Sequence, residues 1–245
     1  MEIPTGFTDK AKFVRIIFTD VEKEYDALLR WMTLGFDWVW RRMIFSKMDF
    51  SRDMIVLDLA CGTGLVTFEL CRLVRPTDLI LGVDLSPAML RVANRKKQNV
   101  PLACDVGFVR ATGEFIPLRS GAINYVTVCL ALRNFADKIS VFRESLRVLT
   151  HDGWFLSLDF IVPENHTIWR LYRFHIFHVL PTIGSLVSEY WKRTLTYLAI
   201  TISKSSPPNE ICQTLSNIGF ANTFLERVTL GVVALVGGQK RVLVK

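Results

Sequence analysis

The sequence has no long uninterrupted hydrophobic run, although half of its 245 residues are hydrophobic. A membrane-spanning helix needs roughly 18 consecutive apolar residues. The longest candidate, residues 174–188, contains two histidines, a proline and a glycine. No basic segment followed by an apolar one opens the chain, so no secretory signal is expected. These absences favour a cytoplasmic protein, and they leave open a peripheral position at the inner face of a membrane.

Cysteine is scarce and lacks the spacing of a metal site. The five cysteines form no Cys-x-x-Cys pair and are odd in number. This argues against a zinc site and fits a reducing compartment. Dense runs of lysine and arginine are also missing, although the net charge is +7. Charge alone therefore does not indicate nucleic acid, and no nucleic-acid partner is expected.

What the sequence does contain is one informative stretch, residues 54–64, which reads MIVLDLACGTG. Its apolar run predicts a strand that ends at Asp58, and Gly62 and Gly64 then precede a helical pattern over 65–75. Glycine lets the backbone approach a ligand closely, and the free N–H groups of a helix N-terminus favour an anionic group. The stretch therefore predicts a turn that holds a nucleotide-like molecule.

Two common nucleotide-binding motifs are excluded at this turn. The third glycine of the dinucleotide fingerprint is replaced by Thr67, and the Walker Gly-Lys-Ser/Thr is absent. The pattern that remains is Asp58-x-Ala60-x-Gly62-x-Gly64. The alternative, a glycine turn with no ligand, is less favoured because a second acid follows at the distance that an adenosine site requires.

That second acid is Asp84, 22 residues after Gly62, at the end of a strand expected over 79–83. An acid in this position can accept hydrogen bonds from both ribose hydroxyls. Its alternative role, capping the helix expected over 87–97, is better filled by Ser86 because a proline follows at the first helical position. Asp84 is therefore predicted to bind the ribose.

Strands and helices alternate from residue 54 onward, which is the signature of a doubly wound, mostly parallel sheet. Helices are expected over 9–19, 21–31 and 36–47, further strands over 108–111, 123–130 and 154–160, and a terminal antiparallel pair over 220–228 and 231–236. We divide the chain into an N-terminal helical cap (1–50), a Rossmann-like core (51–163), a helical lid or insertion (164–206) and a completion of the core with a β-hairpin (207–245).

Ligands of open α/β sheets bind at the carboxyl ends of the strands. Arg133 and Asn134 follow the strand expected over 123–130, and Asp159 lies near the end of the next strand. These residues are candidates for the substrate site, and the alternative for Arg133 is a surface arginine near a helix start. Three tryptophans within residues 31–40 are expected in the core rather than over an aromatic ligand.

The segment 164–206 interrupts the alternation. Its apolar residues at helical spacing form a stripe, and Phe174 and Phe177 add aromatic rings to the other side. A helix that is apolar nearly all round is buried or meets something apolar. Between 166 and 204 five basic residues accompany one acid, Glu189. The segment therefore predicts a lid over a lipid-like substrate or a helix at a membrane surface, with a packed helix pair or a homodimer face equally open.

Taken together these motifs resemble the UbiE/COQ5/MenG family of quinone-precursor C-methyltransferases, and the likeness covers nearly the whole chain. It includes residues 18–26, Trp40-Arg41-Arg42, the glycine turn, Leu132-Arg133-Asn134 and Val179-Leu180-Pro181-x-x-Gly184. The turn alone is shared by class I methyltransferases that use S-adenosylmethionine (SAM). The resemblance implies their fold, a mostly parallel seven-stranded Rossmann-like sheet with helices on both faces.

The resemblance also implies a site. SAM would be bound by Asp58, Ala60, Gly62, Gly64, Asp84, Leu85, Met89, Thr112 and Gly113. The substrate would be a lipid-like, prenylated quinol that is methylated on carbon. Arg133 would stabilise the developing oxyanion or orient a water, Asn134 would place the ring, and Tyr25 would close over the cofactor. The isoprenoid tail would be covered by residues 168–187.

Five positions depart from the family pattern. Thr112 stands in place of an acid, Leu29 in place of Asn, Asp37 and Val236 each in place of His, and Ala199 in place of Pro. These departures leave open a methyltransferase of another lipid or small natural product. A non-catalytic family member in a quinone-synthesis assembly is a further alternative. A nucleic-acid methyltransferase is disfavoured because Leu-Arg-Asn occupies the place of a Pro-Pro-aromatic motif.

Overall fold

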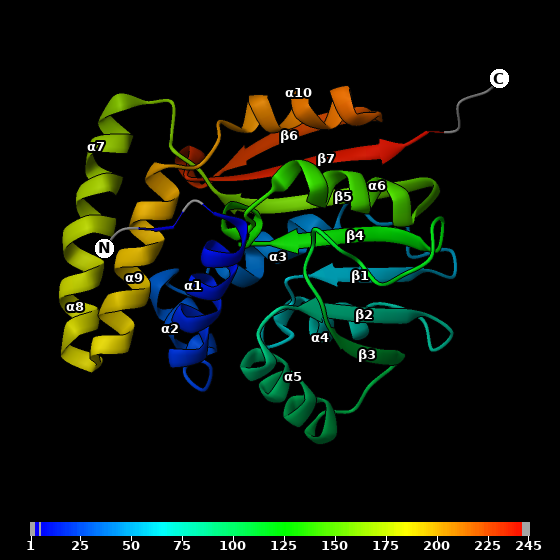
Figure 1. Cartoon of the computed structure of the whole chain (residues 1–245), viewed down its shortest axis with the longest axis horizontal. Coiled ribbons are helices and arrows are strands. Elements are labelled where there is room, and N and C mark those ends of the chain that lie inside the picture. Colours follow the sequence, from blue (N-terminus) through cyan, green and yellow to red (C-terminus); the bar gives the residue numbers. More distant parts are fainter. Residues whose placement is uncertain (1–2, 5, 242–245) are drawn as a thin grey trace.

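The computed structural model describes residues 3–4 and 6–241 and has a seven-stranded sheet at its centre (Figure 1). The strand order is β3-β2-β1-β4-β5-β7-β6. Strands β1 to β5 run parallel, and β7 is antiparallel to both β5 and β6. The strands are β1 (Ile55–Leu59), β2 (Leu79–Asp84), β3 (Asp105–Arg110), β4 (Ile123–Cys129), β5 (Leu149–Phe160), β6 (Phe220–Val228) and β7 (Val233–Lys240). The predicted fold class is confirmed.

Strand β5 differs most from its predicted bounds. It begins at Leu149 instead of residue 154, because Leu149 pairs with Ile123 across an irregularity in the β4 register. The strand thereby includes residues 151–153, whose sequence His-Asp-Gly is typical of a turn, and Asp152 takes a positive φ of 63°. Since local turn residues predicted a break, only the pairing with a distant strand reveals the longer element.

Helices cover both faces of the sheet. Alternate residues of one strand point to opposite faces, so Val56 joins one hydrophobic cluster and Leu57 another. The first cluster includes residues of α3 (Asp37–Phe45) and α4 (Leu65–Cys71), and the second includes residues of α6 (Lys138–Val148) and α10 (Pro208–Ile218). Helix α5 (Pro87–Asn99) packs on β2 and β3. The glycine turn between β1 and α4 is thus held between two packed layers.

The remaining helices lie at the edge of the sheet where the strands of the parallel part end (Figure 1). Helices α1 (Phe7–Asp20) and α2 (Tyr25–Met32) precede α3. Helices α7 (His166–Phe174) and α8 (Leu180–Val187) are joined by a π-helical turn, His175–Val179, so that 166–187 form one continuous helix, here called the outer rod. Helix α9 (Glu189–Ser203) returns beside it. Residues 3–4 and 6–241 include no helix of the length and hydropathy needed to cross a bilayer.

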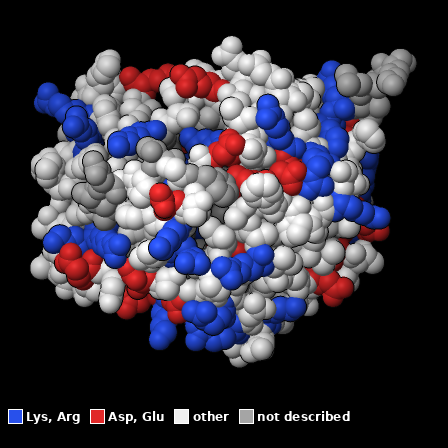
Figure 2. Space-filling model, viewed as in Figure 1, with Lys and Arg blue, Asp and Glu red and all other residues white. Residues whose placement is uncertain are grey.

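Two of the three tryptophans expected in the core have packed environments. Trp40 is buried, its ring meets Phe160 edge-on, and its Nε1 donates to Thr229 Oγ1 at 2.8 Å. Trp31 packs against the ring of Trp191. Trp38 is instead largely exposed, with the Arg42 guanidinium over its ring. Figure 2 shows lysine and arginine side chains spread over the visible face rather than gathered into one patch.

Candidate active site

A cavity with roughly 840 Å³ of atom-free space, part of it open to solvent, lies at the carboxyl ends of the parallel strands. We call it the strand-end cavity. One wall comes from helix α1. Of the residues predicted to bind cofactor or substrate, those in its wall are Tyr25, Ala60, Gly62, Asp84, Leu85, Met89, Thr112, Gly113 and Asn134. Asp58, Gly64 and Arg133 are outside this wall.

The turn between β1 and α4 is shaped by left-handed backbone conformations. Ala60, Gly62 and Gly64 have φ values of 57°, 56° and 83°. At Gly64 a Cβ atom would lie 2.7 Å from the Phe68 ring, so this glycine serves close packing rather than ligand contact. Ala60 has no such freedom, and strained positions of this kind cluster at functional sites. The turn thus presents Ala60 and Gly62 to the cavity.

Asp84 fastens this turn to the end of β2. Its carboxylate accepts hydrogen bonds from the N–H of Gly62 at 2.8 Å and from the N–H of Ser86 at 2.7 Å. Ser86 Oγ accepts from Met89 N–H at 3.4 Å, so Ser86 caps α5 as predicted. Burial raises the pKa of Asp84. Each carboxylate oxygen can accept a further bond, which leaves capacity for two hydroxyls at the cavity.

Asp58 points into the protein rather than into the strand-end cavity. It is buried, and one oxygen accepts from Thr67 N–H at 3.1 Å and Thr67 Oγ1 at 2.6 Å, which fixes the start of α4. Burial raises its pKa to about 7 despite these hydrogen bonds. Asp58 also lines a smaller neighbouring cavity together with Arg41 and Thr63. It therefore positions the turn.

Two polar residues that follow β3, Thr112 and Glu114, differ in whether their side chains have hydrogen-bond partners. Thr112 Oγ1 is buried at the cavity wall and has no hydrogen-bond partner among the residues that the structure describes. A buried hydroxyl without a partner costs free energy, so a ligand that pairs with it gains from this position. Glu114, which sequence reasoning did not single out, is buried and accepts from Ala136 N–H at 3.1 Å. It holds the segment that includes Phe135, another wall residue.

Arg133 lies in a second, mostly apolar cavity, here called the side cavity, with roughly 350 Å³ of atom-free space. Its side chain is only 7% exposed and forms an ion pair with Asp159. The guanidinium also donates to Leu130 O at 2.7 Å and to Thr201 Oγ1 at 3.3 Å. The alternative of a surface arginine is therefore wrong. Phe18 and Tyr25 belong to the walls of both cavities, so the two cavities are neighbours.

Three phenols surround this arginine. Tyr197 is buried and Tyr25 and Tyr172 are partly buried. Burial raises the pKa of each phenol, while the nearby positive charge of Arg133 lowers it. Tyr197 Oη donates to Asn134 Oδ1 at 2.9 Å, which orients the Asn134 amide. Sequence reasoning gave Tyr172 and Tyr197 no role. Their only signal was their place in the aromatic insertion.

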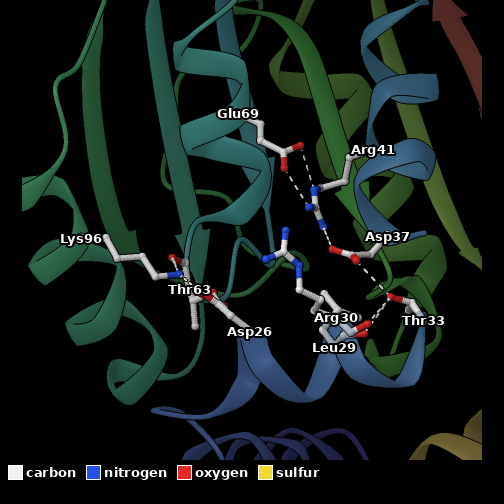
Figure 3. A network of polar contacts seen from close by, with 9 residues as sticks. All are labelled: Asp26, Leu29, Arg30, Thr33, Asp37, Arg41, Thr63, Glu69 and Lys96. Atoms are coloured by element: carbon white, nitrogen blue, oxygen red, sulfur yellow. Dashed lines mark hydrogen bonds and ion pairs between the residues drawn. The ribbon is translucent and has the colours of Figure 1, made fainter. Parts of the chain in front are cut away.

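A buried ionic cluster joins α2, α3 and α4 behind the turn (Figure 3). Arg41, with a 5% exposed side chain, donates to Asp37 at 2.5 Å and to both oxygens of Glu69 at 2.9 and 2.8 Å. Thr33 Oγ1 donates to Asp37 at 3.0 Å. Asp37, one of the departures from the family pattern, is thus the partner of a buried arginine.

A second group of polar contacts connects the glycine turn to the N-terminal helical cap. Thr63 Oγ1 donates to Asp26 at 2.5 Å, and Lys96 forms an ion pair with the same carboxylate and donates to Thr63 O at 3.1 Å (Figure 3). These residues come from the turn, α2 and α5. The start of α2, which brings Tyr25 to both cavities, is therefore fixed to the glycine turn.

Comparison with known proteins gives the same assignment for nearly the whole chain. Residues 6–240 match the model of the ubiE/COQ5 methyltransferase family. The chain is 32% identical over 235 residues to a ubiquinone/menaquinone biosynthesis C-methyltransferase UbiE of Pseudoalteromonas translucida, covering 95% of this chain and 92% of that one. A UbiE of Geobacter sulfurreducens is 31% identical, covering 95% and 90%.

Solved structures share the fold at low identity. A SAM-dependent methyltransferase from Thermotoga maritima, described as a possible histamine N-methyltransferase, superposes with a TM-score of 0.61 at 13% identity over 92% of this chain and all of that one. A SAM-dependent methyltransferase from Aquifex aeolicus has a TM-score of 0.57 at 14% identity, with coverages of 81% and 88%. These likenesses show the class I SAM-methyltransferase fold.

Proposed function

The chain belongs to the ubiE/COQ5 methyltransferase family of SAM-dependent enzymes, and from this premise we propose that it methylates a ring carbon of a prenylated quinol in quinone biosynthesis. The observation that carries the proposal is the position of Arg133, buried in an apolar cavity that shares Phe18 and Tyr25 with the strand-end cavity. This arrangement supports the proposal, because a fixed positive charge lies in an apolar cavity next to the cavity that we assign to the cofactor.

The strand-end cavity fits SAM on the chemistry of its wall. Asp84 offers two acceptors for ribose hydroxyls, and Thr112 offers an unpaired hydroxyl where an adenine amino group would lie. Met89 and Leu85 give apolar surface for the purine. Bound there, SAM would supply an electrophilic methyl group on its sulfonium. The glycine turn would hold the methionine end.

The residues of the side cavity then act on the substrate. Ring carbon becomes nucleophilic when a quinol hydroxyl loses its proton, so the site must favour the phenolate. Arg133 is always protonated, so it cannot serve as the base. It would stabilise the developing oxyanion and orient a water that takes the hydroxyl proton, and its ion pair with Asp159 holds it in place before substrate arrives. The ring carbon that accepts the methyl group then loses its hydrogen to water, which restores the aromatic ring. Asn134, oriented by Tyr197, places the ring. Leu28 and Leu198 exclude water around the charge.

The test is transfer of a labelled methyl group from SAM to a chemically reduced demethylmenaquinone analogue in detergent. We expect transfer by the parent, and a loss of roughly 10²–10³ in turnover for Arg133→Ala, as for other oxyanion-stabilising groups. Arg143→Ala, which removes an exposed arginine of α6, is the matched control and should leave turnover unchanged. An Arg133→Ala turnover within a factor of a few of the parent would contradict the assigned role.

A second candidate is methylation of another lipid or small natural product, and Leu29 favours it. Leu29 stands where the family resemblance expects Asn, and it lines the side cavity. Replacing an amide by an isobutyl group removes a partner for a polar ring substituent. No transfer to the quinol, with SAM binding confirmed by calorimetry, would favour this candidate. No SAM binding at all would instead favour a non-catalytic member of the family.

A further inference from the structure

The outer rod has an apolar face that nothing in the described chain covers. Five of its residues form what we call the outer stripe: Leu171, Phe174, Ile183, Leu186 and Val187, with exposures of 67, 62, 40, 83 and 57%. Single exposed apolar residues are ordinary, whereas a contiguous exposed patch marks an interaction site. The outer stripe is therefore a candidate interaction surface.

The opposite side of the rod explains why these residues face outward. Ile176, Leu180 and Gly184 recur every four residues and are buried. A Cβ atom at Gly184 would lie 2.5 Å from the Leu195 side chain, so the rod packs on α9 without space for a side chain there. With the inner face fixed in this way, residues on the other side of the helix point away from the protein.

The stripe does not belong to the site already described. Neither the strand-end cavity nor the side cavity has a wall residue from 166–187, whereas α9 contributes Thr194, Leu195 and Leu198 to the side cavity. The rod thus approaches Arg133 only through Tyr172 on its inner side, and the residues of the outer stripe line neither cavity. Its exposed face is free to meet something other than a substrate in those cavities.

The charges of the rod decide which partner fits. No aspartate or glutamate occurs from residue 165 to residue 188, and Arg170 and Arg173 are exposed. The Arg173 guanidinium lies over the Phe177 ring at 5.9 Å. Two copies of this chain packed through the rod would offer these arginines no carboxylate from residues 165–188 to pair with. An anionic surface has the complementary charge.

We propose that the outer stripe is a docking surface for a lipid bilayer with anionic headgroups. The apolar side chains enter the boundary between headgroups and acyl chains, and Arg170 and Arg173 lie at the level of the phosphates. A basic amphipathic helix with this distribution lies in the plane of the interface rather than across it. The proposal concerns surface binding and stands whether or not the proposed reaction is correct.

The test is flotation of the purified full chain with vesicles of phosphatidylcholine alone and of phosphatidylcholine with phosphatidylglycerol. We expect binding to the anionic vesicles, and a loss of roughly tenfold or more in the variant Leu171→Ser/Phe174→Ser/Leu186→Ser, since each apolar group contributes through its buried area. Arg170→Gln/Arg173→Gln should lose roughly fivefold per arginine on anionic vesicles. Ile139→Ser, an equally simple change of an exposed apolar residue on α6, is the control and should float like the parent.

Three results would overturn the proposal. The first is that the parent does not float with anionic vesicles. The second is that the triple serine variant floats as the parent does, while circular dichroism shows that both are folded. The third is that sedimentation shows a dimer of the parent and a monomer of the triple serine variant, which would make the stripe a subunit interface. None of these readouts depends on methyl transfer, so they are separate from the test of the reaction.

Discussion

The buried cluster of Arg41, Asp37 and Glu69 predicts that two single substitutions lower the free energy of unfolding by different amounts. Arg41 is the only cation among these three groups and accounts for every ion pair between them. We compare Arg41→Met, which keeps the length of the side chain and removes its charge, with Asp37→Asn, which keeps the shape of the acid and removes its charge.

The magnitudes follow from what each variant leaves behind. Arg41→Met leaves two carboxylates close together beside buried Asp58, and breaking a buried pair in this way costs about 3–5 kcal/mol. Asp37→Asn leaves Arg41 with both oxygens of Glu69 at 2.9 and 2.8 Å. The amide still accepts one hydrogen bond from Arg41. We therefore expect this variant to lose only about 1–2 kcal/mol.

Urea denaturation near neutral pH measures both free energies of unfolding. A further variant, Arg41→Met with Asp37→Asn and Glu69→Gln, removes all three charges and should regain roughly 2 kcal/mol or more over Arg41→Met alone, because neutral replacement of a buried ionic group is often tolerated. Equal losses for Arg41→Met and Asp37→Asn would refute the reasoning, as would no gain in the uncharged variant.

Three further predictions follow from single residues. The pKa of Asp58 is raised from 3.8 to about 7, so between these pH values the folded state keeps a proton that the unfolded state loses. The free energy of unfolding of the parent should therefore fall as pH rises from about 4 to 7 and then level off, and over this range Asp58→Asn should gain roughly 2–4 kcal/mol relative to the parent. Urea denaturation across pH measures this difference, and a pH-independent difference would contradict the prediction. Thr112→Val should weaken SAM binding roughly fivefold in calorimetry while leaving thermal stability equal or higher, because it removes a buried hydroxyl without a partner; unchanged affinity would exclude the contact. Gly64→Ala should lower stability by about 1–3 kcal/mol through its left-handed backbone and the contact with Phe68, whereas Gly121→Ala, left-handed but with open space, should cost less in the same melt.

The parts of the site predictable from sequence are those fixed by residues close together in the chain. The turn, Asp84 at the end of β2 and the Ser86 cap each follow from short-range pattern, and the structure has Ser86 as the cap. The order of strands and helices was predictable for the same reason. The exception is β5, whose first residues pair with a neighbouring strand in spite of their turn-forming composition.

The parts not predictable depend on contacts between distant residues. Arg41 meets Glu69 across 28 positions of sequence, and Tyr197 meets Asn134 across 63. Nothing in the local pattern of either residue indicates its partner. The unpaired hydroxyl of Thr112 is equally invisible in sequence, because only the packing around it shows that no neighbour satisfies it.

Helix α1 covers part of the strand-end cavity, so its motion bears on turnover. Its residues Val14 and Phe18 form part of the wall of the strand-end cavity, so the cofactor proposed for this cavity would be covered by this helix. The helix is held by Lys10 Nζ on Phe135 O at 2.6 Å and by an ion pair of Asp20 with Arg193 of α9 at 3.0 Å. Motions of such covering elements take microseconds to milliseconds and often limit turnover. The outer rod packs on α9, and α9 meets α1 through this ion pair and through Tyr197 against the rings of Phe13 and Phe18. We therefore expect contact at the periphery of the molecule to alter the motion of the helix that covers the strand-end cavity.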